Sequence, residues 1–388
     1  MVLGSILSQT VTLLLIALGV GLAFLVVQVV IFSWLCKWAD RQTDGNAYYG
    51  RSLGDRRRFK KSLSRRAKLV APLLWLLSRG NAVSLDQASF EYEKVSGPKD
   101  SCSEETYARA AAYEPTAEDV FVVTPMKCGT TWMQHLVYQI LNRGRGDLVE
   151  SGRALYGVSP WIEARKSVSM EAAPRVGSAS PRRLIKTHLP TSLCPYDAAA
   201  RYIYVVRHPV SCFASTVDFI RTNLGPFDIP LADFEAWFCS DKMWWSSWPE
   251  HVSEWQTWAQ ERPNVMFVRF EDMKRDLDAV ANQVAEFLGE AELSNEERQQ
   301  VVRQCSFAYM RDNAEAFEMS VPNLLQCHSS LFVSGKIDRR DDVPPDVQAR
   351  ILAWCRAAME ERFVALEQIY RDAAAGIPED RAPASSRS

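Results

Sequence analysis

The sequence predicts an α/β fold, a three-layer domain with a central parallel sheet that is preceded by one N-terminal transmembrane helix. Three observations lead to this prediction. Residues 1–36 are apolar over a length sufficient to cross a bilayer. Between residues 91 and 375, short β-type runs alternate with segments of helical periodicity, which is typical of βαβ units. A turn between one such run and the next helix contains lysine, glycine and threonine.

Composition excludes several classes of protein. The chain has 388 residues, of which 47% are hydrophobic and 24% charged, and its net charge is −2. These values exclude disordered, collagen-like and disulfide-scaffold chains, and the near-neutral charge argues against a nucleic-acid partner. The 9 cysteines are scattered without a CxxC pair, and none of the 5 histidines is paired at helical spacing. We therefore expect a reducing compartment, no disulfide framework and no metal site.

The N-terminal segment is expected to be a membrane anchor. Residues 11–35 are almost continuously apolar, with few polar interruptions such as Gln28 and Ser33. About 20 such residues cross a bilayer as a helix. A secretory signal would have a basic start and a shorter apolar run, whereas no Lys or Arg precedes Lys37. We assign residues 1–36 to the anchor.

Basic residues follow the anchor directly. Residues 37–68 contain 11 Lys and Arg against 3 Asp, and the positive-inside tendency places this side, with the rest of the chain, in the cytoplasm. We expect a basic juxtamembrane linker over residues 37–90, either simply solvated or attracted to anionic headgroups. Its short apolar run LVAPLLWLL, residues 69–77, would lie in the membrane interface or dock on the domain. A flexible tail is expected at residues 376–388.

The elements of the domain, residues 91–375, follow from hydrophobic periodicity. Strands are expected at residues 120–123, 184–185, 202–206 and 265–270. Helices are expected at residues 130–143, 210–220, 277–288, 296–304 and 347–370. In a parallel sheet of this kind, ligands bind at the carboxyl ends of the strands.

The segment VFVVTPMKCGTTW, residues 120–132, has the features of an anion-binding loop. A strand leads into a loop with Lys127 and Gly129, and a helix begins at Thr130 and Thr131. Backbone N–H groups at a helix N-terminus favour anions, and glycine permits close approach. The lysine precedes the glycine, so the loop differs from the GxxxxGK[ST] loop of nucleotide triphosphatases. An ordinary strand–helix turn is the alternative interpretation.

Two further segments carry candidate site residues. RYIYVVRHPVSCFAS places Arg207 at the end of a strand and Ser215 on a helix face, where both could contact a second anionic group. A surface ion pair of Arg207 is the alternative. RLIKTHLP places Lys186 and His188 on the same side of an extended segment. A histidine takes a proton from a hydroxyl near neutral pH and a lysine stabilises the developing charge; a structural histidine is the alternative.

Together these segments resemble the sulfotransferase family that uses 3′-phosphoadenylyl sulfate (PAPS). PMKCGTTW is similar to its 5′-phosphosulfate loop PKSGTTW, with Cys128 in place of serine. VVRHPVSCFAS is similar to its 3′-phosphate segment, in which Arg and Ser stand eight residues apart, and KTHLP matches its catalytic-histidine segment. FEDMKRD and CSFAYM resemble its YEDMK and TSFKEM. The similarity extends from about residue 121 to residue 342.

The resemblance implies a fold, a reaction and a set of site residues. It implies a P-loop-like α/β domain and a PAPS-dependent sulfotransferase of EC 2.8.2 type that uses no metal. His188 would be the general base, and Lys127 and Lys186 would neutralise charge on the transferring and leaving oxygens. The residues implied to bind the donor are Lys127, Cys128, Gly129, Thr130, Thr131, Trp132, Arg207, Ser215, Phe270, Cys305, Met310, Gly335 and Lys336.

The C-terminal segment departs from the family. The stretch RKGxxGDWK, which binds the 3′-phosphate in the family, is represented only by VSGKIDRRDD at residues 333–342, and its usual arginine is missing. Lys336, Arg339 or Arg340 would then supply the positive charge. Affinity for the donor is the property that this departure affects.

The acceptor is expected to be a small molecule or a lipid, such as a glycolipid or another apolar alcohol. Residues 227–258 contain six tryptophans, and WWSSWPEHVSEW resembles the family's helix beside the acceptor site; core packing is the alternative. Residues 221–237 are the candidate lid. Two other functions stay open: an ATP-dependent phosphotransferase, disfavoured because no GK[ST] loop is present, and a membrane-tethered nucleotide-binding protein without catalysis.

Overall fold

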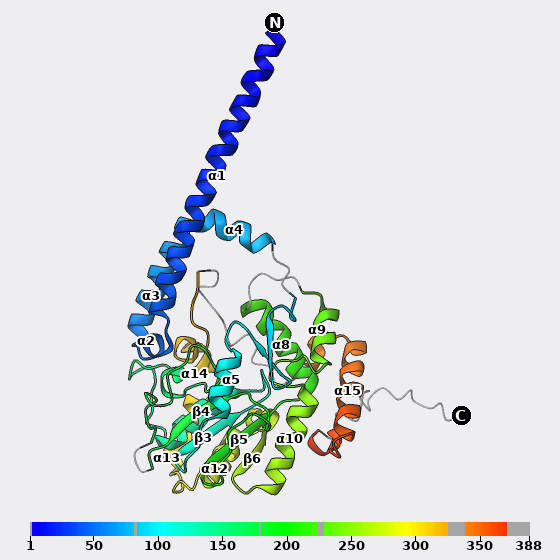
Figure 1. Ribbon diagram of the computed structural model, residues 1–388. Helices are drawn as coiled ribbons and strands as arrows, with labels where there is room; N and C mark the ends of the chain where they lie inside the picture. The colour runs from blue at the N-terminus through cyan, green and yellow to red at the C-terminus, as the bar shows by residue number, and fades with distance from the viewer. Residues whose placement is uncertain (1, 81–83, 178–179, 224–228, 325–337, 371–388) are drawn as a thin grey trace, which may run out of the picture.

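Four parallel strands form the central sheet of the computed structural model (Figure 1), which describes residues 2–80, 84–177, 180–223, 229–324 and 338–370. In spatial order the strands are β4 (Arg183–Thr187), β3 (Asp119–Val123), β5 (Arg201–Val206) and β6 (Val265–Arg269). All pairings between them are parallel. This confirms the predicted α/β fold and places β3, which precedes the predicted anion-binding loop, inside the sheet.

Successive residues of each strand point to opposite faces of the sheet, and each face is covered by helices. Val120 and Val122 pack with one helical layer, formed by α6 (Thr130–Leu141), α12 (Leu277–Phe287), α13 (Asn295–Gln304) and α14 (Phe307–Asp312). Phe121 and Val123 pack with the other, formed by α8 (Pro209–Asn223), α9 (Leu231–Phe238), α10 (Trp248–Glu261) and α15 (Pro345–Glu360). The result is the predicted three-layer arrangement.

Shorter elements complete the domain. An unpredicted antiparallel hairpin comes first, and short helices connect the larger elements. These elements are β1 (Ser89–Tyr92), β2 (Val95–Pro98), α5 (Glu104–Ala111), α7 (Leu155–Val158), α11 (Phe270–Arg275), η2 (Ala314–Phe317), η3 (Arg340–Asp342) and α16 (Leu366–Ile369).

The prediction of one helix over residues 347–370 was wrong. Helix α15 ends at Glu360, and the chain turns at Phe363, which has a φ of 58° and is 98% exposed, before the short α16. The turn lets Val364, Leu366 and Ile369 pack into the core. Periodicity alone did not reveal this break because apolar residues continue on both sides of it.

The N-terminal helix α1 (Val2–Gln42) projects away from the domain (Figure 1). Its residues 10–42 are long and apolar enough to cross a membrane by length and composition. Large apolar side chains such as Leu14, Leu18 and Leu22 are more than 60% exposed, whereas Leu35 and Ala39 near its C-terminal end are buried in the domain. The helix therefore joins the domain without a flexible hinge.

The structure differs from the expected linker over residues 37–90. After α1, this region forms α2 (Gly45–Tyr49), α3 (Leu53–Ala67), η1 (Lys68–Val70) and α4 (Ala71–Gly80). Leu53, Phe59 and Leu63 of α3 are buried in the same cluster as Val120 and Val122 of the sheet. These apolar residues recur at helical spacing inside a strongly basic run, and they make α3 amphipathic.

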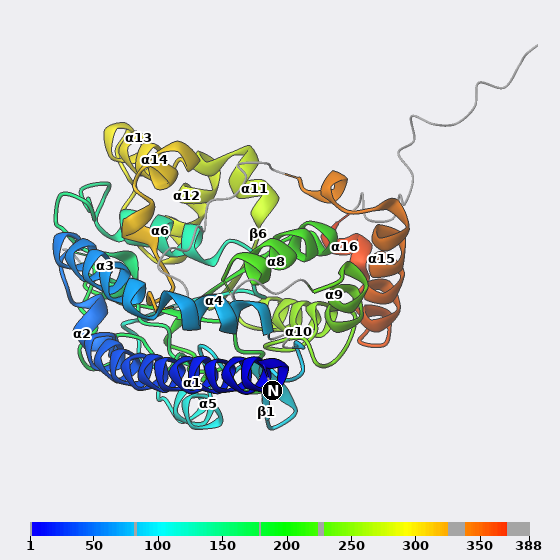
Figure 2. The ribbon, with the colours of Figure 1, turned by 90° about the horizontal axis from the view of Figure 1, so that it is seen from above.

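The apolar run at residues 69–77 is helical and packs beside α1. Val70 and Leu73 are buried, and the Gln28 side chain of α1 donates a hydrogen bond to the carbonyl oxygen of Leu69 at 3.1 Å. Trp75 and Leu76 are 57% and 51% exposed. Seen from above, α4 extends across the top of the domain on the side from which α1 projects (Figure 2).

Candidate active site

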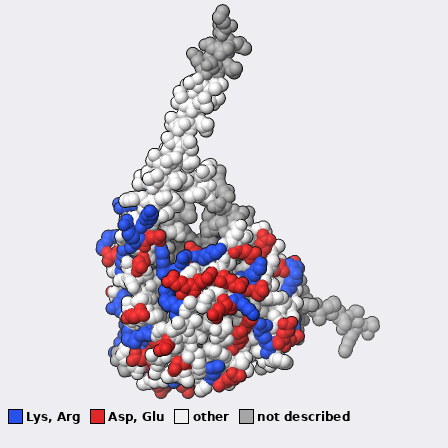
Figure 3. Space-filling model, viewed as in Figure 1, with Lys and Arg blue, Asp and Glu red and all other residues white. Residues whose placement is uncertain are grey.

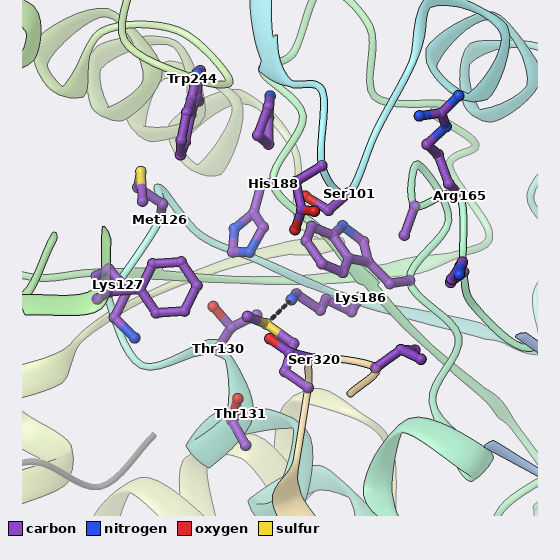
Figure 4. A pocket seen from close by; sticks show the side chains of 18 of the residues that line it. Ser101, Met126, Lys127, Thr130, Thr131, Arg165, Lys186, His188, Trp244 and Ser320 are labelled. Carbon is purple, nitrogen blue, oxygen red and sulfur yellow. Dashed lines mark hydrogen bonds between the residues drawn. The ribbon is translucent and has the colours of Figure 1, made fainter. Parts of the chain in front are cut away.

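The carboxyl ends of three neighbouring strands meet at one cavity of about 930 Å³ (Figure 4). A residue that follows each strand lines it: Lys127 after β3, His188 after β4 and Arg207 after β5. Parallel strands place their ligand sites at this edge of the sheet. The three segments that the sequence analysis selected therefore come together.

The loop between β3 and α6 has the backbone shape of an anion site. Lys127 and Gly129 have positive φ angles of 65° and 103°, so that the chain turns tightly before α6. A Cβ atom at Gly129 would lie 2.7 Å from the ring of Phe270, so glycine is required for both conformation and space. Thr130 and Thr131 open the helix and line the cavity. The N–H groups of this first turn favour an anion in front of them.

His188 is held in the tautomer that a general base needs. Its Nδ1 donates a hydrogen bond to the backbone carbonyl oxygen of Thr124 at 2.8 Å, which leaves a lone pair on Nε2. Its backbone N–H donates to Oε1 of Glu163 at 2.7 Å, and its carbonyl accepts from Nε2 of His251 at 2.9 Å. Burial, and then the charge of Lys186, holds the pKa of His188 well below its usual value. The imidazole is therefore neutral at pH 7.

Two lysines point into the same space (Figure 4). The Nζ atom of Lys186 lies 3.5 Å from the ring centroid of Trp161 and donates a hydrogen bond to Sδ of Met319 at 3.1 Å. Burial lowers the pKa of Lys186 to about 7 and that of Lys127 to about 8, because desolvation disfavours the ammonium form. An anion in the cavity would restore the charge of both lysines.

Arg207 and Arg339 make a second basic region of the cavity, together with Ser215. Arg207 is only 6% exposed, and its buried Nε has no hydrogen-bond partner among the described residues. Arg339 forms an ion pair with Asp218 at 2.8 Å. The buried Nε–H of Arg207 lacks an acceptor among the described residues, and Arg339 adds a second positive charge to this region. An anionic oxygen bound here would accept a hydrogen bond from Arg207.

Between the loop and this second basic region lies an aromatic wall. The rings of Trp132 and Phe270 are arranged edge to face with centroids 5.5 Å apart, and Phe307 and Met310 extend the wall. The indole Nε1 of Trp132 donates to the carbonyl oxygen of Cys305 at 2.8 Å. A flat heterocycle such as a purine fits a surface of this kind.

Some predicted donor-binding residues do not line the cavity with their side chains. Cys128 is fully buried, and its Sγ lies 3.7 Å from Sγ of Cys212 in the core. Cys305 is also fully buried and contributes its carbonyl oxygen to Trp132. Gly335 and Lys336 lie outside the described residues. Every other residue of the predicted donor site lines the cavity.

Lys336, Arg339 and Arg340 are the candidates to replace the positive charge of the family's missing C-terminal arginine, and the structure distinguishes two of them. Arg339 lines the cavity, whereas Arg340 does not and pairs instead with Asp338 at 2.5 Å. The backbone N–H of Arg339 donates to Oγ of Ser211 in α8 at 3.1 Å, which fixes the segment against that helix. The third candidate, Lys336, lies outside the described residues.

Beyond His188 the cavity continues between aromatic side chains, of which Trp161 had no signal in the sequence. The rings of Trp245 and Trp161 lie 4.8 and 5.5 Å from the imidazole, and Trp244 lies beside them. Trp244 and Trp245 belong to the WWSSW segment, whose resemblance to the family's acceptor region was the available signal. In the candidate lid at residues 221–237, none of the described residues lines the cavity.

The outer part of the cavity is lined by the base of α1. Cys36, Ala39, Asp40 and Thr43 contribute to it, with Tyr49 of α2. Lys166 also lines the cavity and forms an ion pair with Asp40 at 2.7 Å. Nothing in the sequence pattern indicated that residues at the end of the apolar helix would reach the site.

Comparison with known proteins identifies the family. The family model of the sulfotransferase domain matches residues 117–363. The chain is 29% identical to the 3-alpha-hydroxysteroid sulfotransferase of Cavia porcellus over 67% of this chain and 85% of that protein. It is 28% identical to sulfotransferase 1C2 of Oryctolagus cuniculus over 58% of this chain and 76% of that protein.

Solved structures share the fold. Mouse sulfotransferase SULT7A1, complexed with PAP, superposes with a TM-score of 0.58 at 21% identity over 74% of this chain and 98% of that one. A retinol dehydratase complexed with androsterone and the inactive cofactor PAP superposes with a TM-score of 0.55 at 20% identity over 73% and 95%.

The chain belongs to the sulfotransferase family. The family that the motifs predicted is thus confirmed, together with the α/β fold and the class of enzyme, a PAPS-dependent sulfotransferase. Within the described residues no group of three or more His, Cys, Asp and Glu side chains is placed to hold a metal ion.

Proposed function

We propose that this protein transfers the sulfuryl group of PAPS to a hydroxyl of a membrane-borne alcohol, with His188 as the general base. One observation carries the proposal. The Nε2 lone pair of a neutral His188, two lysines and the N-terminus of α6 all face a single cavity. General-base attack on an activated anionic group needs this combination.

The donor fits the two basic regions and the aromatic wall. Lys127, Gly129, Thr130 and Thr131 would hold its 5′ phosphosulfate, and the purine would lie against the wall of Trp132, Phe270 and Phe307. The 3′-phosphate would bind Arg207, Ser215 and Arg339 and so satisfy the buried Nε of Arg207. Selection for a 3′-phosphate excludes ATP. The PAP complexes of two structural neighbours support this assignment.

The chemistry of the chain's own residues follows from their charge states. The donor supplies an activated sulfuryl group when it is bound. His188 takes the proton of the acceptor hydroxyl at Nε2, and the hydroxyl oxygen forms the new bond to sulfur as the bond to the leaving phosphate oxygen breaks. Lys186 and Lys127 neutralise charge on the transferring and leaving oxygens, and this electrostatic stabilisation is commonly the largest contribution in group transfer.

The position of α1 supports a lipid or another apolar membrane alcohol as acceptor. The base of the proposed membrane anchor lines the same cavity as His188, and the rings of Trp161 and Trp245 pack against that histidine. An alcohol held in the membrane interface would enter along α1 and reach Nε2 with its hydroxyl. The exposed Trp75 and Leu76 of α4 would lie in the same interface.

The membrane topology follows from charge. Lys and Arg side chains gather where the apolar helix meets the domain (Figure 3), and α3 supplies Arg57, Arg58, Lys61 and Arg65 there. Basic residues next to a span remain on the cytoplasmic side. We therefore propose a single-pass protein whose catalytic domain lies at the cytoplasmic surface of its membrane.

A thermal-shift titration of the full chain in detergent tests the donor assignment. Adenosine 3′,5′-bisphosphate at 100 times its dissociation constant stabilises the fold by about 2.7 kcal/mol, which is a readily measured shift. We expect this stabilisation from the bisphosphate, its loss in Arg207→Ala, and none from ATP with magnesium. Stabilisation by ATP with magnesium alone would instead support a phosphotransferase and would contradict the proposal.

A further inference from the structure

A short segment between α14 and the donor-binding C-terminal region lines the cavity. Residues 319–324 follow η2 and line the cavity. The segment has no regular secondary structure of its own. Contacts with other parts of the chain therefore fix its position: Leu324 is buried in the core, and polar contacts at Glu318 and Met319 connect it to the N-terminal helices.

Glu318 is a buried carboxylate that is 6% exposed. Its Oε2 lies 2.6 Å from Nζ of Lys60 and 3.4 Å from a guanidinium nitrogen of Arg56, and it accepts a hydrogen bond from the hydroxyl of Tyr48 at 3.2 Å. Arg56 is itself 2% exposed and stacks over the ring of Tyr48 at 4.5 Å. Buried charges persist only when they are paired in this way.

All three partners of Glu318 come from the N-terminal helices. Tyr48 belongs to α2, and Arg56 and Lys60 belong to α3. These helices precede the part of the chain that matches the sulfotransferase domain, residues 117–363. The segment that lines the cavity is thus held from outside that domain.

Met319 links the N-terminal helices to the cavity through two hydrogen bonds. Its carbonyl oxygen accepts a hydrogen bond from the hydroxyl of Tyr49 in α2. Its Sδ accepts the hydrogen bond that Nζ of Lys186 donates at 3.1 Å, shown as the dashed line in Figure 4. Two adjacent residues therefore link the juxtamembrane helices to a lysine of the proposed reaction.

We infer that Glu318 is a positioning residue: held by Tyr48, Arg56 and Lys60, it fixes Met319 and residues 320–324 so that Lys186 points at the transferring group. The inference rests on the proposed function of Lys186. It follows that the N-terminal helices are part of the active site's support as well as a membrane anchor. Loss of their contacts with Glu318 and Met319 would impair chemistry even in an enzyme that still binds its donor.

Single substitutions in the full chain test this inference. Glu318→Gln removes the buried charge, and Tyr49→Phe removes only the hydrogen bond to Met319, so that the second variant keeps the test valid if the first does not fold. Glu315→Gln is the matched control, because Glu315 lies in the preceding η2 and pairs with Arg57 of α3 in an exposed ion pair. Lys60→Arg, which keeps the positive charge, is the conservative variant of the cluster.

The readouts separate positioning from general stability. We expect kcat for sulfuryl transfer to fall roughly tenfold to a hundredfold in Glu318→Gln and Tyr49→Phe, as misplacement of a catalytic group by about 1 Å does. The dissociation constant of adenosine 3′,5′-bisphosphate and the KM for the donor should rise by a smaller factor than kcat falls, because Lys127, Arg207 and Arg339 stay in place and Lys186 supplies only part of the positive charge. Glu315→Gln and Lys60→Arg should retain the wild-type kcat.

Three outcomes would overturn the inference. These are an unchanged kcat in Tyr49→Phe and Glu318→Gln, an equal effect of Glu315→Gln, or a parallel loss of bisphosphate binding. Hydrogen exchange of the backbone amides at residues 314–324 is a measurement that does not depend on sulfuryl transfer. The exchange should become faster in Glu318→Gln but not in Glu315→Gln. If the wild type transfers no sulfate, the proposed function fails, but the hydrogen-exchange measurement still tests whether Glu318 holds the segment.

Discussion

Lys186 and His188 lie two residues apart, at the end of β4. The proposed reaction needs Lys186 protonated and His188 neutral. Burial disfavours the charged form of both, so it assists the base and opposes the lysine. Glu163 compensates in part, because its buried carboxylate raises the pKa of Lys186 while it accepts the backbone N–H of His188. The anionic donor would complete the compensation.

Replacement of His188 by alanine should separate chemistry from binding. We expect the rate of sulfuryl transfer to fall by a factor of about 10² to 10⁴, the usual contribution of a general base. Binding of adenosine 3′,5′-bisphosphate, measured by thermal shift, should persist, because Lys127, Arg207 and Arg339 remain. Loss of both properties together would indicate that the histidine is structural.

The lowered pKa values of the two lysines predict that donor affinity weakens at alkaline pH. An ammonium that binds the phosphates is present below its pKa and is lost as the pH rises through that value, about 7 for Lys186 and about 8 for Lys127. The dissociation constant of the bisphosphate should then rise between pH 7 and pH 9, by up to about tenfold per pH unit for each proton lost.

Lys186→Arg is the control for this pH dependence. Arginine stays protonated throughout this range, so the onset of weakening should move upward to the range of Lys127, near pH 8. His188 does not contribute, because its pKa is lowered and it is neutral over the whole interval. A dissociation constant that is flat from pH 7 to pH 9 in the wild type would show that the lysines do not contact the phosphates.

Single residues of the site could largely be predicted from motifs, with instructive exceptions. The alignment of PMKCGTTW gave Lys127, Gly129 and the threonines, because a phosphate loop depends on local backbone shape. It also selected Cys128, whose side chain points into the core against Cys212. A motif fixes which residues are adjacent, whereas the direction of a side chain is decided by packing.

At the scale of secondary-structure elements, η3 and the residue before it stand in the part of the sequence that resembles the family's C-terminal motif. Arg339 reaches the cavity from the N-terminal side of η3, while Arg340 within η3 pairs with Asp338. Both are basic and adjacent, so the sequence could not distinguish them. The difference arises because Ser211 of α8 binds the backbone of Arg339 and orients this turn.

The pair of adjacent arginines allows a matched test of the 3′-phosphate site. Arg339→Gln should weaken binding of adenosine 3′,5′-bisphosphate about tenfold to a hundredfold, because a charged hydrogen bond contributes about 1.5–3 kcal/mol and Asp218 is left unpaired beside the anion. Arg340→Gln should change affinity less than about twofold. Isothermal titration calorimetry measures both, and equal effects would contradict the assignment.

The many basic residues of helix α3 explain why the sequence predicted a linker here and not a helix of the domain. Its 15 residues include seven Lys and Arg, which led to the expectation of a solvated linker. Yet Leu53, Arg56, Phe59 and Leu63 are buried, and they recur at the spacing of one helix face. Hydrophobic periodicity was thus present, although a basic run next to a membrane span is more often unstructured.

For the molecule as a whole, the N-terminal region has two parts that differ in burial. The apolar part of α1 is exposed, whereas its last turns, α2 and α3 share a core with the sheet. The end of α1 and α2 line the outer cavity, and α2 and α3 hold Glu318. Long-range packing between residues 35–70 and residues 315–320 leaves no trace in local composition.

Truncation should therefore have an effect that depends sharply on position. A chain that begins at Val30 loses mainly exposed apolar residues and should keep a melting temperature within a few degrees of the full chain. A chain that begins at Glu91 loses buried side chains such as Leu35, Leu53, Phe59 and Leu63, each contributing about 1.5–3 kcal/mol. Their sum approaches the whole stability of a domain.

Circular dichroism melts of the purified chains distinguish these cases. We expect the chain from Glu91 to melt far below the full chain or to aggregate when expressed, whereas the chain from Val30 stays folded. Equal melting temperatures for all three would show that the N-terminal helices do not belong to the domain core.

The most direct test of the account is to follow the labelled sulfuryl group itself. The full chain in detergent is incubated with PAPS labelled with ³⁵S and a lipid extract as the source of acceptors, and the organic phase is counted and resolved by chromatography. We predict that label enters a lipid alcohol with the wild type and not with His188→Ala. Label that stays on the donor, or leaves it only as inorganic sulfate, would contradict the proposal that this protein is a sulfotransferase acting on a membrane-borne hydroxyl.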